Sequence, residues 1–170
     1  MDTPLWKFSV SIYHQPGVAA ECLALQDRIG VNVNVLLFGI YVGCQFGAVL
    51  ACDDISAADH AIAQWHAHVV RALREVRQHL KHRSARSEAP HAEAIEQLRT
   101  QVKLAELESE RIESALLTEW CDTRLCDWPR RERTVAITHN CHSVLAHYRA
   151  GQPTDLPQRL IESAAQMLRP

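Results

Sequence analysis

The longest apolar segment of the chain runs from residue 33 to residue 52, VNVLLFGIYVGCQFGAVLAC, and carries no charged side chain. A helix that is apolar on every side must be surrounded by protein or by lipid. Gly39, Gly43 and Gly47 recur four residues apart and therefore lie along one side of that helix. The pattern predicts a central helix over 33–52, with one face that a second backbone can approach closely.

The remaining segments are amphipathic. Apolar residues recur at three-and-four spacing over 57–83 and again over 92–120, which predicts two long helices. A polar break at 84–91 separates them, so we expect them to pair as an antiparallel hairpin. Shorter helices are predicted over 4–14, 18–29, 132–150 and 156–168. The fold class is therefore predicted to be all-α, a single-domain bundle of about six to seven helices around the central helix.

Composition agrees with a globular domain. The 170 residues are 47% hydrophobic and 22% charged, and the length suffices for one core. A net charge of −2 gives no basic field, so no nucleic-acid partner is expected. Six cysteines occur without a secretory start, which predicts free thiols and a cytoplasmic location.

The apolar segment has a second interpretation. Twenty apolar residues are long enough to span a bilayer, and glycines four apart also occur where helices dimerise in lipid. However, Gln45 lies inside the segment, and no Lys or Arg flanks it to set a topology. We therefore expect a buried helix and no integral membrane insertion, with use of the helix in a dimer core left open.

Short motifs in the first two thirds of the chain follow one another in a characteristic order. They are Leu5-Trp6, Phe8-Ser9, Tyr13, Pro16-Gly17-Val18, Cys22-Leu23, Leu25-Gln26, Gly30, Val33-Asn34, Leu36-Leu37-Phe38, Trp65, Val69-Val70, Arg71, Arg74, Arg77, Lys81, Glu106-Leu107 and Glu110-Arg111. This order resembles an uncharacterised proteobacterial family of small proteins that is known only as a domain of unknown function. The resemblance covers about 5–117 and leaves 121–170 unassigned. It implies a bacterial, cytoplasmic, helical protein, and it supplies no catalytic residue.

Cations follow one face of the predicted 57–83 helix. They are Arg71, Arg74, Arg77 and Lys81. Acidic residues dominate the next helix, so the hairpin brings opposite charges together. One interpretation is a structural salt-bridge seam that fixes the register of the hairpin. The other is an anion site in which Arg71 and Arg74 bind a phosphate or carboxylate, with Glu106 and Glu110 opposite.

Several polar residues interrupt otherwise apolar segments. They are Tyr13, Gln26, Asp27, Asn34 and Gln45. Buried polar groups need hydrogen-bond partners, which Arg71 or Arg74 can supply. Such a set either forms an internal network or lines a pocket between helices, with Asn34 as a candidate ligand-binding residue.

The last third contains a candidate metal set. Its members are Cys121, Cys126, His139 and His142. Zinc takes four sulfur and nitrogen ligands, so this set is chemically suited to zinc, the one cofactor considered. The spacing, however, matches no standard ligand pair.

No nucleophile elbow, P-loop or dinucleotide glycine pattern is present. We therefore expect a non-enzymatic cytoplasmic adaptor or regulatory protein that acts through helical surfaces, with a protein partner or self-association as a homodimer. The alternative is a helical-bundle enzyme or binder of an anionic small molecule near Arg71 and Arg74.

Overall fold

A computed structural model describes residues 2–86, 91–149 and 154–168. Its helices are α1 (Pro4–Tyr13), α2 (Val18–Ile29), α3 (Val33–Phe46), α4 (Cys52–Trp65), the π-helix η1 (His66–Val70), α5 (Arg71–Ser84), α6 (His91–Asp122), α7 (Arg133–Tyr148) and α8 (Gln158–Gln166). The described residues contain no β-strand, which confirms the predicted all-α class. The predicted break at 84–91 and the predicted helix end at residue 150 fall partly on 87–90 and 150–153, outside the described residues.

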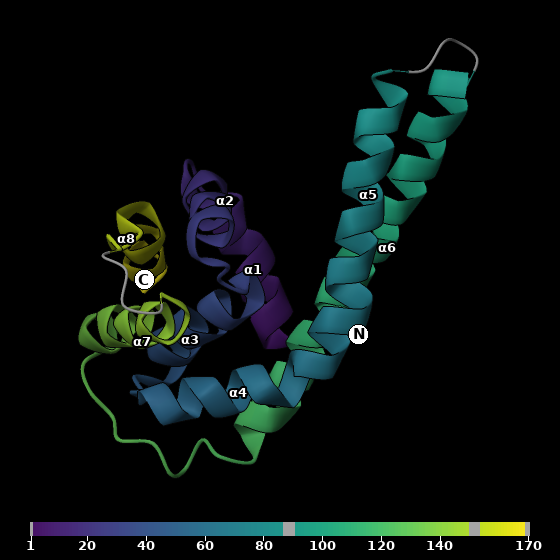
Figure 1. Cartoon of the computed structure of the whole chain (residues 1–170). Coiled ribbons are helices and arrows are strands. Elements are labelled where there is room, and N and C mark those ends of the chain that lie inside the picture. The colour runs from purple at the N-terminus through teal and green to yellow at the C-terminus, as the bar shows by residue number, and fades with distance from the viewer. Residues whose placement is uncertain (1, 87–90, 150–153, 169–170) are drawn as a thin grey trace.

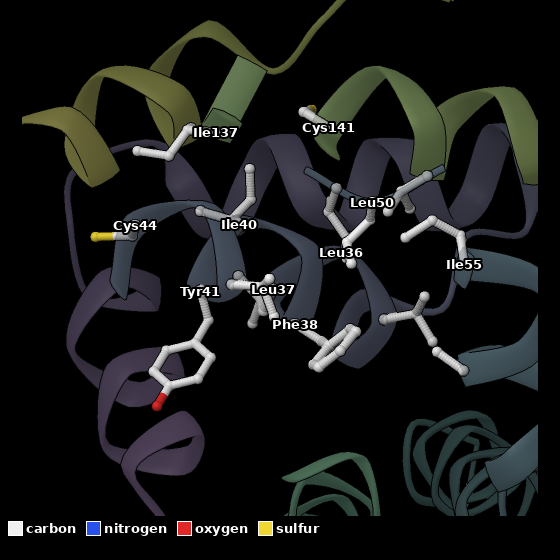
Figure 2. Close-up of a cluster of buried hydrophobic side chains, with 14 of the residues drawn as sticks. Leu36, Leu37, Phe38, Ile40, Tyr41, Cys44, Leu50, Ile55, Ile137 and Cys141 are labelled. Carbon is white, nitrogen blue, oxygen red and sulfur yellow. The ribbon is translucent and has the colours of Figure 1, made fainter. Parts of the chain in front are cut away.

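Helix α3 lies at the centre of the molecule. Every residue from Val35 to Cys44 is buried, and α1, α2, α4, α6, α7 and α8 all contact this helix. Figure 2 shows Leu36, Phe38 and Ile40 within this core. The predicted buried central helix is thus confirmed. None of the described helices combines the length and the apolar character that a bilayer span requires.

The glycine-lined face of α3 packs against α7. A Cβ atom on Gly43 would lie 2.7 Å from the backbone nitrogen of Ile137, and one on Gly39 would lie 3.1 Å from Val144 Cγ2. Both distances are shorter than an ordinary carbon contact. The predicted close approach of a second backbone is therefore confirmed, and α7 is the helix that makes it.

The central helix ends six residues earlier than predicted. Gly47 takes a left-handed conformation with φ of 62° and caps the helix, which glycine does at little cost. The chain then runs extended beside Asn140 of α7, whose amide accepts from Leu50 N at 2.8 Å and donates to Ala48 O at 2.9 Å. Because Asn140 satisfies these buried backbone groups, an apolar segment can leave the helix without penalty.

The two long helices form the expected hairpin, with shifted boundaries. Helix α4 begins at Cys52 rather than near residue 57, and the Asp54 carboxylate accepts from Ala51 N at 2.8 Å at its start. The π turn of η1 separates α4 from α5, and the chain changes direction there (Figure 1).

Only part of the hairpin covers the core. Helix α5 and the N-terminal half of α6 project from the other helices (Figure 1), and no residue of α5 is buried. The C-terminal half of α6 instead contributes buried side chains, among them Glu113, Leu117 and Cys121. The hairpin is therefore anchored at its base.

Candidate functional site

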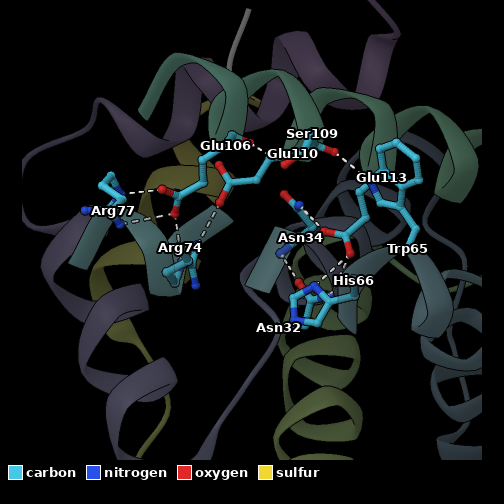
Figure 3. Close-up of polar contacts among 10 residues, drawn as sticks. All are labelled: Asn32, Asn34, Trp65, His66, Arg74, Arg77, Glu106, Ser109, Glu110 and Glu113. Atoms are coloured by element: carbon cyan, nitrogen blue, oxygen red, sulfur yellow. Dashed lines mark hydrogen bonds and ion pairs between the residues drawn. The ribbon is translucent and has the colours of Figure 1, made fainter. Parts of the chain in front are cut away.

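The base of the hairpin is held by an ion-pair seam between α5 and α6 (Figure 3). Arg74 Nε lies 2.9 Å from Glu106 Oε1, and Arg74 Nη2 lies 2.7 Å from Glu110 Oε1. Arg77 also pairs with Glu106. The sequence-based interpretation of a structural seam is confirmed for these four residues.

Arg71 does not share this environment. Its side chain is 62% exposed, and its guanidinium lies 3.7 Å from Glu75. Arg71 and Arg74 both line a wide surface hollow of about 590 Å³, but Asp27 and Asp59 line it as well. The Arg74 guanidinium already pairs with two glutamates, so this geometry does not leave it free to bind an anion in bidentate fashion. The anion site therefore remains a prediction.

A buried polar cluster lies beside the seam, around Glu113 of α6. This carboxylate is fully buried and accepts from His66 Nδ1 at 2.8 Å, from Asn32 Nδ2 at 3.3 Å and from Asn34 Nδ2 (Figure 3). A buried carboxylate is tolerated when several donors satisfy it. Trp65, next to His66, donates from Nε1 to Ser109 O at 3.0 Å and fixes η1 against α6.

The tautomer of His66 follows from these contacts. An ionised Glu113 can only accept, so His66 Nδ1 carries the proton and donates it to the carboxylate. Asn32 Nδ2 lies 3.0 Å from the same ring nitrogen because both donors converge on one carboxylate oxygen. In the neutral ring His66 Nε2 is then an acceptor, and no group in the described part of the chain is hydrogen-bonded to it.

A cavity of about 140 Å³ opens next to this cluster. Glu113 and the 6%-exposed Ser9 are among its buried lining residues. Its exposed lining residues are apolar: Val10, Leu23 and Leu107 are 38%, 48% and 50% exposed. The cavity therefore has a polar floor and an apolar rim.

Helical spacing explains how the cavity walls are built. Trp6, Ser9, Val10 and Tyr13 are three or four residues apart on α1 and line the cavity together. Leu5 and Ile12 lie four and three residues from Ser9, on the adjoining face of the helix, and are buried in the core. His66, Val70 and Arg74 supply the facing wall in steps of four residues.

Electrostatics differ among the glutamates of α6. Burial raises the pKa of Glu110 to about 6; Arg74 opposes the rise, and the charges of Glu106 and Glu113 add to it. Burial would also raise the pKa of Glu106, but the hydrogen bonds from Arg77 and Arg74 outweigh it and hold this pKa below its usual value. The two arginines thus stabilise the ionised form of Glu106 more than that of Glu110.

The sequence identified part of this site. Tyr13, Gln26, Asn34, Arg74 and Glu110 line the cavity, as expected for a pocket built from polar residues on apolar segments. Glu113, His66 and Ser9 were not identified as site residues. The i+7 spacing of Glu113 from Glu106 on the acidic helix was one available signal; His66 gave none.

The four proposed zinc ligands are not gathered. Cys121 is buried near the end of α6, where burial raises the pKa of its thiol to about 12, whereas His139 and His142 are exposed on α7. No group of three or more potential ligands occurs in the residues that the structure describes. The members of the set thus face different surroundings, and zinc binding by these four residues stays a prediction.

Comparison with known proteins identifies a family and no function. Residues 4–117 match the family model described as "Protein of unknown function (DUF2390)", a span that includes the whole seam and every residue that lines the cavity. No curated protein and no solved structure matches the chain. The resemblance noted from the sequence is thereby confirmed, and the chain belongs to the DUF2390 family of proteins of unknown function.

Proposed function

We propose that the protein binds a small molecule in the cavity between α1 and α6. The observation that carries this proposal is the polar floor built around Glu113 beneath an apolar rim. Sites for small molecules combine an apolar wall with a few fixed polar groups, and perturbed carboxyls cluster in them. The raised pKa of Glu110 adds to that pattern.

The polar cluster also holds the floor in place. Asn32 caps α3 by accepting from Asn34 N at 2.9 Å, while both amides donate to Glu113. A purely structural network needs no void beside it, yet this one borders about 140 Å³ of space. A cavity of about 150 Å³ holds a molecule of the size of benzene.

The test is native mass spectrometry of protein isolated from its native cells without denaturation. We expect a retained small-molecule mass that is absent from Ser9→Leu, which fills the floor, and from Val10→Trp, which covers the rim. Ser11→Leu is the matched control, because Ser11 is exposed and does not line this cavity. Val10→Trp changes only the exposed rim and leaves the core unchanged. It therefore keeps the test valid if Ser9→Leu fails to fold.

Two results would overturn this function. One is an adduct that persists in both cavity variants. The other is a combined negative result: the wild-type protein carries no adduct, and uncharged fragments of up to nine heavy atoms do not change its NMR spectrum.

The projecting hairpin favours a second candidate, an adaptor or regulatory protein that self-associates. On it Val76 and Leu98 are about half exposed, and Leu104 is 64% exposed. Apolar residues in such an arm are typical of an interaction surface. Cations dominate α5 and acids dominate α6, so a second copy packed antiparallel would bring opposite charges together.

Light scattering over a range of protein concentrations tests the second candidate. We expect a dimer that Leu98→Gln with Leu104→Gln converts to a monomer, while Val135→Gln, an exposed apolar position on α7, leaves it intact. A monomer at all concentrations would exclude self-association through this surface.

A further inference from the structure

The cavity floor is not electrostatically neutral. Glu106 and Glu110 pair with Arg74 and Arg77, and Glu113 pairs with His66, so one negative charge is in excess when the His66 ring is neutral. Glu113 contributes most to the excess, because its hydrogen-bond partners, His66 and the two asparagines, bring no fixed positive charge. An additional anion would be repelled from this floor, and a cation would be attracted.

The unused hydrogen-bonding groups point the same way. Glu110 accepts from Arg74 through Oε1 only, so Oε2 is open to a ligand. His66 Nε2 is an acceptor, and the side-chain oxygen of Asn34 has no donor within the described ranges. The amide donors of Asn32 and Asn34 are already engaged by Glu113. Glu110 Oε2, the Asn34 side-chain oxygen and Nε2 of the neutral His66 ring are therefore acceptors that a ligand with N–H donors can satisfy.

The cavity walls define the rest of the ligand. Trp6 and Tyr13 line the cavity, and aromatic faces attract organic cations. Val10, Leu23 and Leu107 form an apolar rim that suits a hydrocarbon group. A volume of about 140 Å³ limits the whole ligand to roughly the size of a substituted benzene ring.

We propose, on the basis of the small-molecule function above, that this cavity binds a small organic amine in its protonated form. The ammonium group lies among Glu110, Asn34 and His66 and donates hydrogen bonds to them. The hydrocarbon group lies between the α1 aromatics and the apolar rim. Glu110 is the residue that selects for positive charge.

A set of three probes of one shape tests this class: benzylamine, benzyl alcohol and benzoate. Each is titrated into the full chain at pH 7.5 and low salt, and the indole N–H resonance of Trp6 reports binding at the cavity. We expect benzylamine to bind at least tenfold more tightly than benzyl alcohol, and benzoate to bind most weakly.

Variants identify the residue responsible. Glu110→Gln keeps the shape and removes the charge, so it should abolish the preference for benzylamine over benzyl alcohol. Glu119→Gln, an exposed glutamate on the same helix, should leave the preference unchanged.

The outcomes separate the ligand class from the function. If benzyl alcohol or benzoate binds as tightly as benzylamine, or if Glu110→Gln keeps the preference, the amine class is overturned and the cavity function stands. If none of the three probes shifts the Trp6 resonance, the amine class is overturned, and the native mass spectrum decides the cavity function by itself.

Discussion

Glu113 and His66 meet in the interior, with a carboxylate oxygen 2.8 Å from the ring Nδ1. His66 belongs to η1 and Glu113 to α6, so this contact joins the two helices where the projecting hairpin meets the body. The carboxylate is fully buried and also receives the amides of Asn32 and Asn34. One side chain therefore ties together the base of the hairpin, the start of α3 and the floor of the cavity.

Glu113→Gln should destabilise the fold strongly. A glutamine amide turns one acceptor into a donor, which would face His66, Asn32 or Asn34, all donors in the present geometry. An unsatisfied buried donor pair costs about 2–4 kcal/mol. Urea unfolding measures this loss, with Glu119→Gln as an exposed control expected within about 0.5 kcal/mol of wild type. Equal stability of the two variants would contradict the assigned hydrogen bonds.

The glycines of α3 should differ in their tolerance of alanine. At Gly43 the new Cβ would meet the backbone of Ile137 at 2.7 Å, so α7 must shift, at a cost of about 1–3 kcal/mol. At Gly39 the nearest atom is a side-chain methyl of Val144 at 3.1 Å, which can move, and alanine also favours the helix by about 1 kcal/mol. Thermal unfolding should therefore rank Gly43→Ala well below Gly39→Ala. The reverse order would contradict the close packing of α3 on α7.

Local pattern predicted the helices well and the tertiary partners poorly. Gly30 and Asn32 cap helices in a way that residue type alone indicates, because a left-handed glycine and a short polar side chain satisfy helix ends locally. Gly47 was misjudged because the helix ends there with the help of Asn140, a residue 93 positions away. Pairing of that kind leaves no periodic signal.

The candidate site divides in the same manner. Arg74 and Glu110 were found together because both follow regular spacing on helices that the polar break made antiparallel. His66 was missed because its position depends on the π turn that re-aims the chain between α4 and α5. The extra residue of a π turn changes the spacing of apolar residues so little that the sequence does not reveal the turn.

Arg74 and Arg71 should make unequal contributions to stability. Arg74→Ala leaves Glu110 without its cation and removes one of the two arginines that pair with the buried Glu106, so we expect a loss of about 2–3 kcal/mol. Arg71→Ala removes an exposed residue 3.7 Å from Glu75, which is worth less than about 0.5 kcal/mol. Chemical denaturation of the two variants provides the comparison. Equal losses would show that the seam is not a selective anchor of the hairpin.

Glu110 and Glu106 should give stability profiles of opposite sign with pH. The folded-state pKa of Glu110, about 6, is above its ordinary value of 4.5, so the folded state holds this proton more tightly. Its contribution to stability therefore falls as pH rises from about 4.5 to 6, by roughly 2 kcal/mol in total for a side chain that is 25% exposed. The pKa of Glu106 is lowered instead, so its contribution is present above the ordinary value and is lost as pH falls through the folded value.

The measurement compares the wild-type free energy of unfolding with that of Glu110→Gln and of Glu106→Gln between pH 4 and pH 7.5. The charged and titratable groups that face Glu110 are Arg74 from α5, Glu106 and Glu113 from α6, and Tyr13 from α1. Arginine stays charged over this range, and burial raises the pKa of Tyr13 further above it. The advantage of wild type over Glu110→Gln should shrink as pH rises, whereas its advantage over Glu106→Gln should shrink as pH falls. A difference between wild type and Glu110→Gln that stays level or grows with pH would show that burial beside Glu106 and Glu113 does not raise the pKa of Glu110.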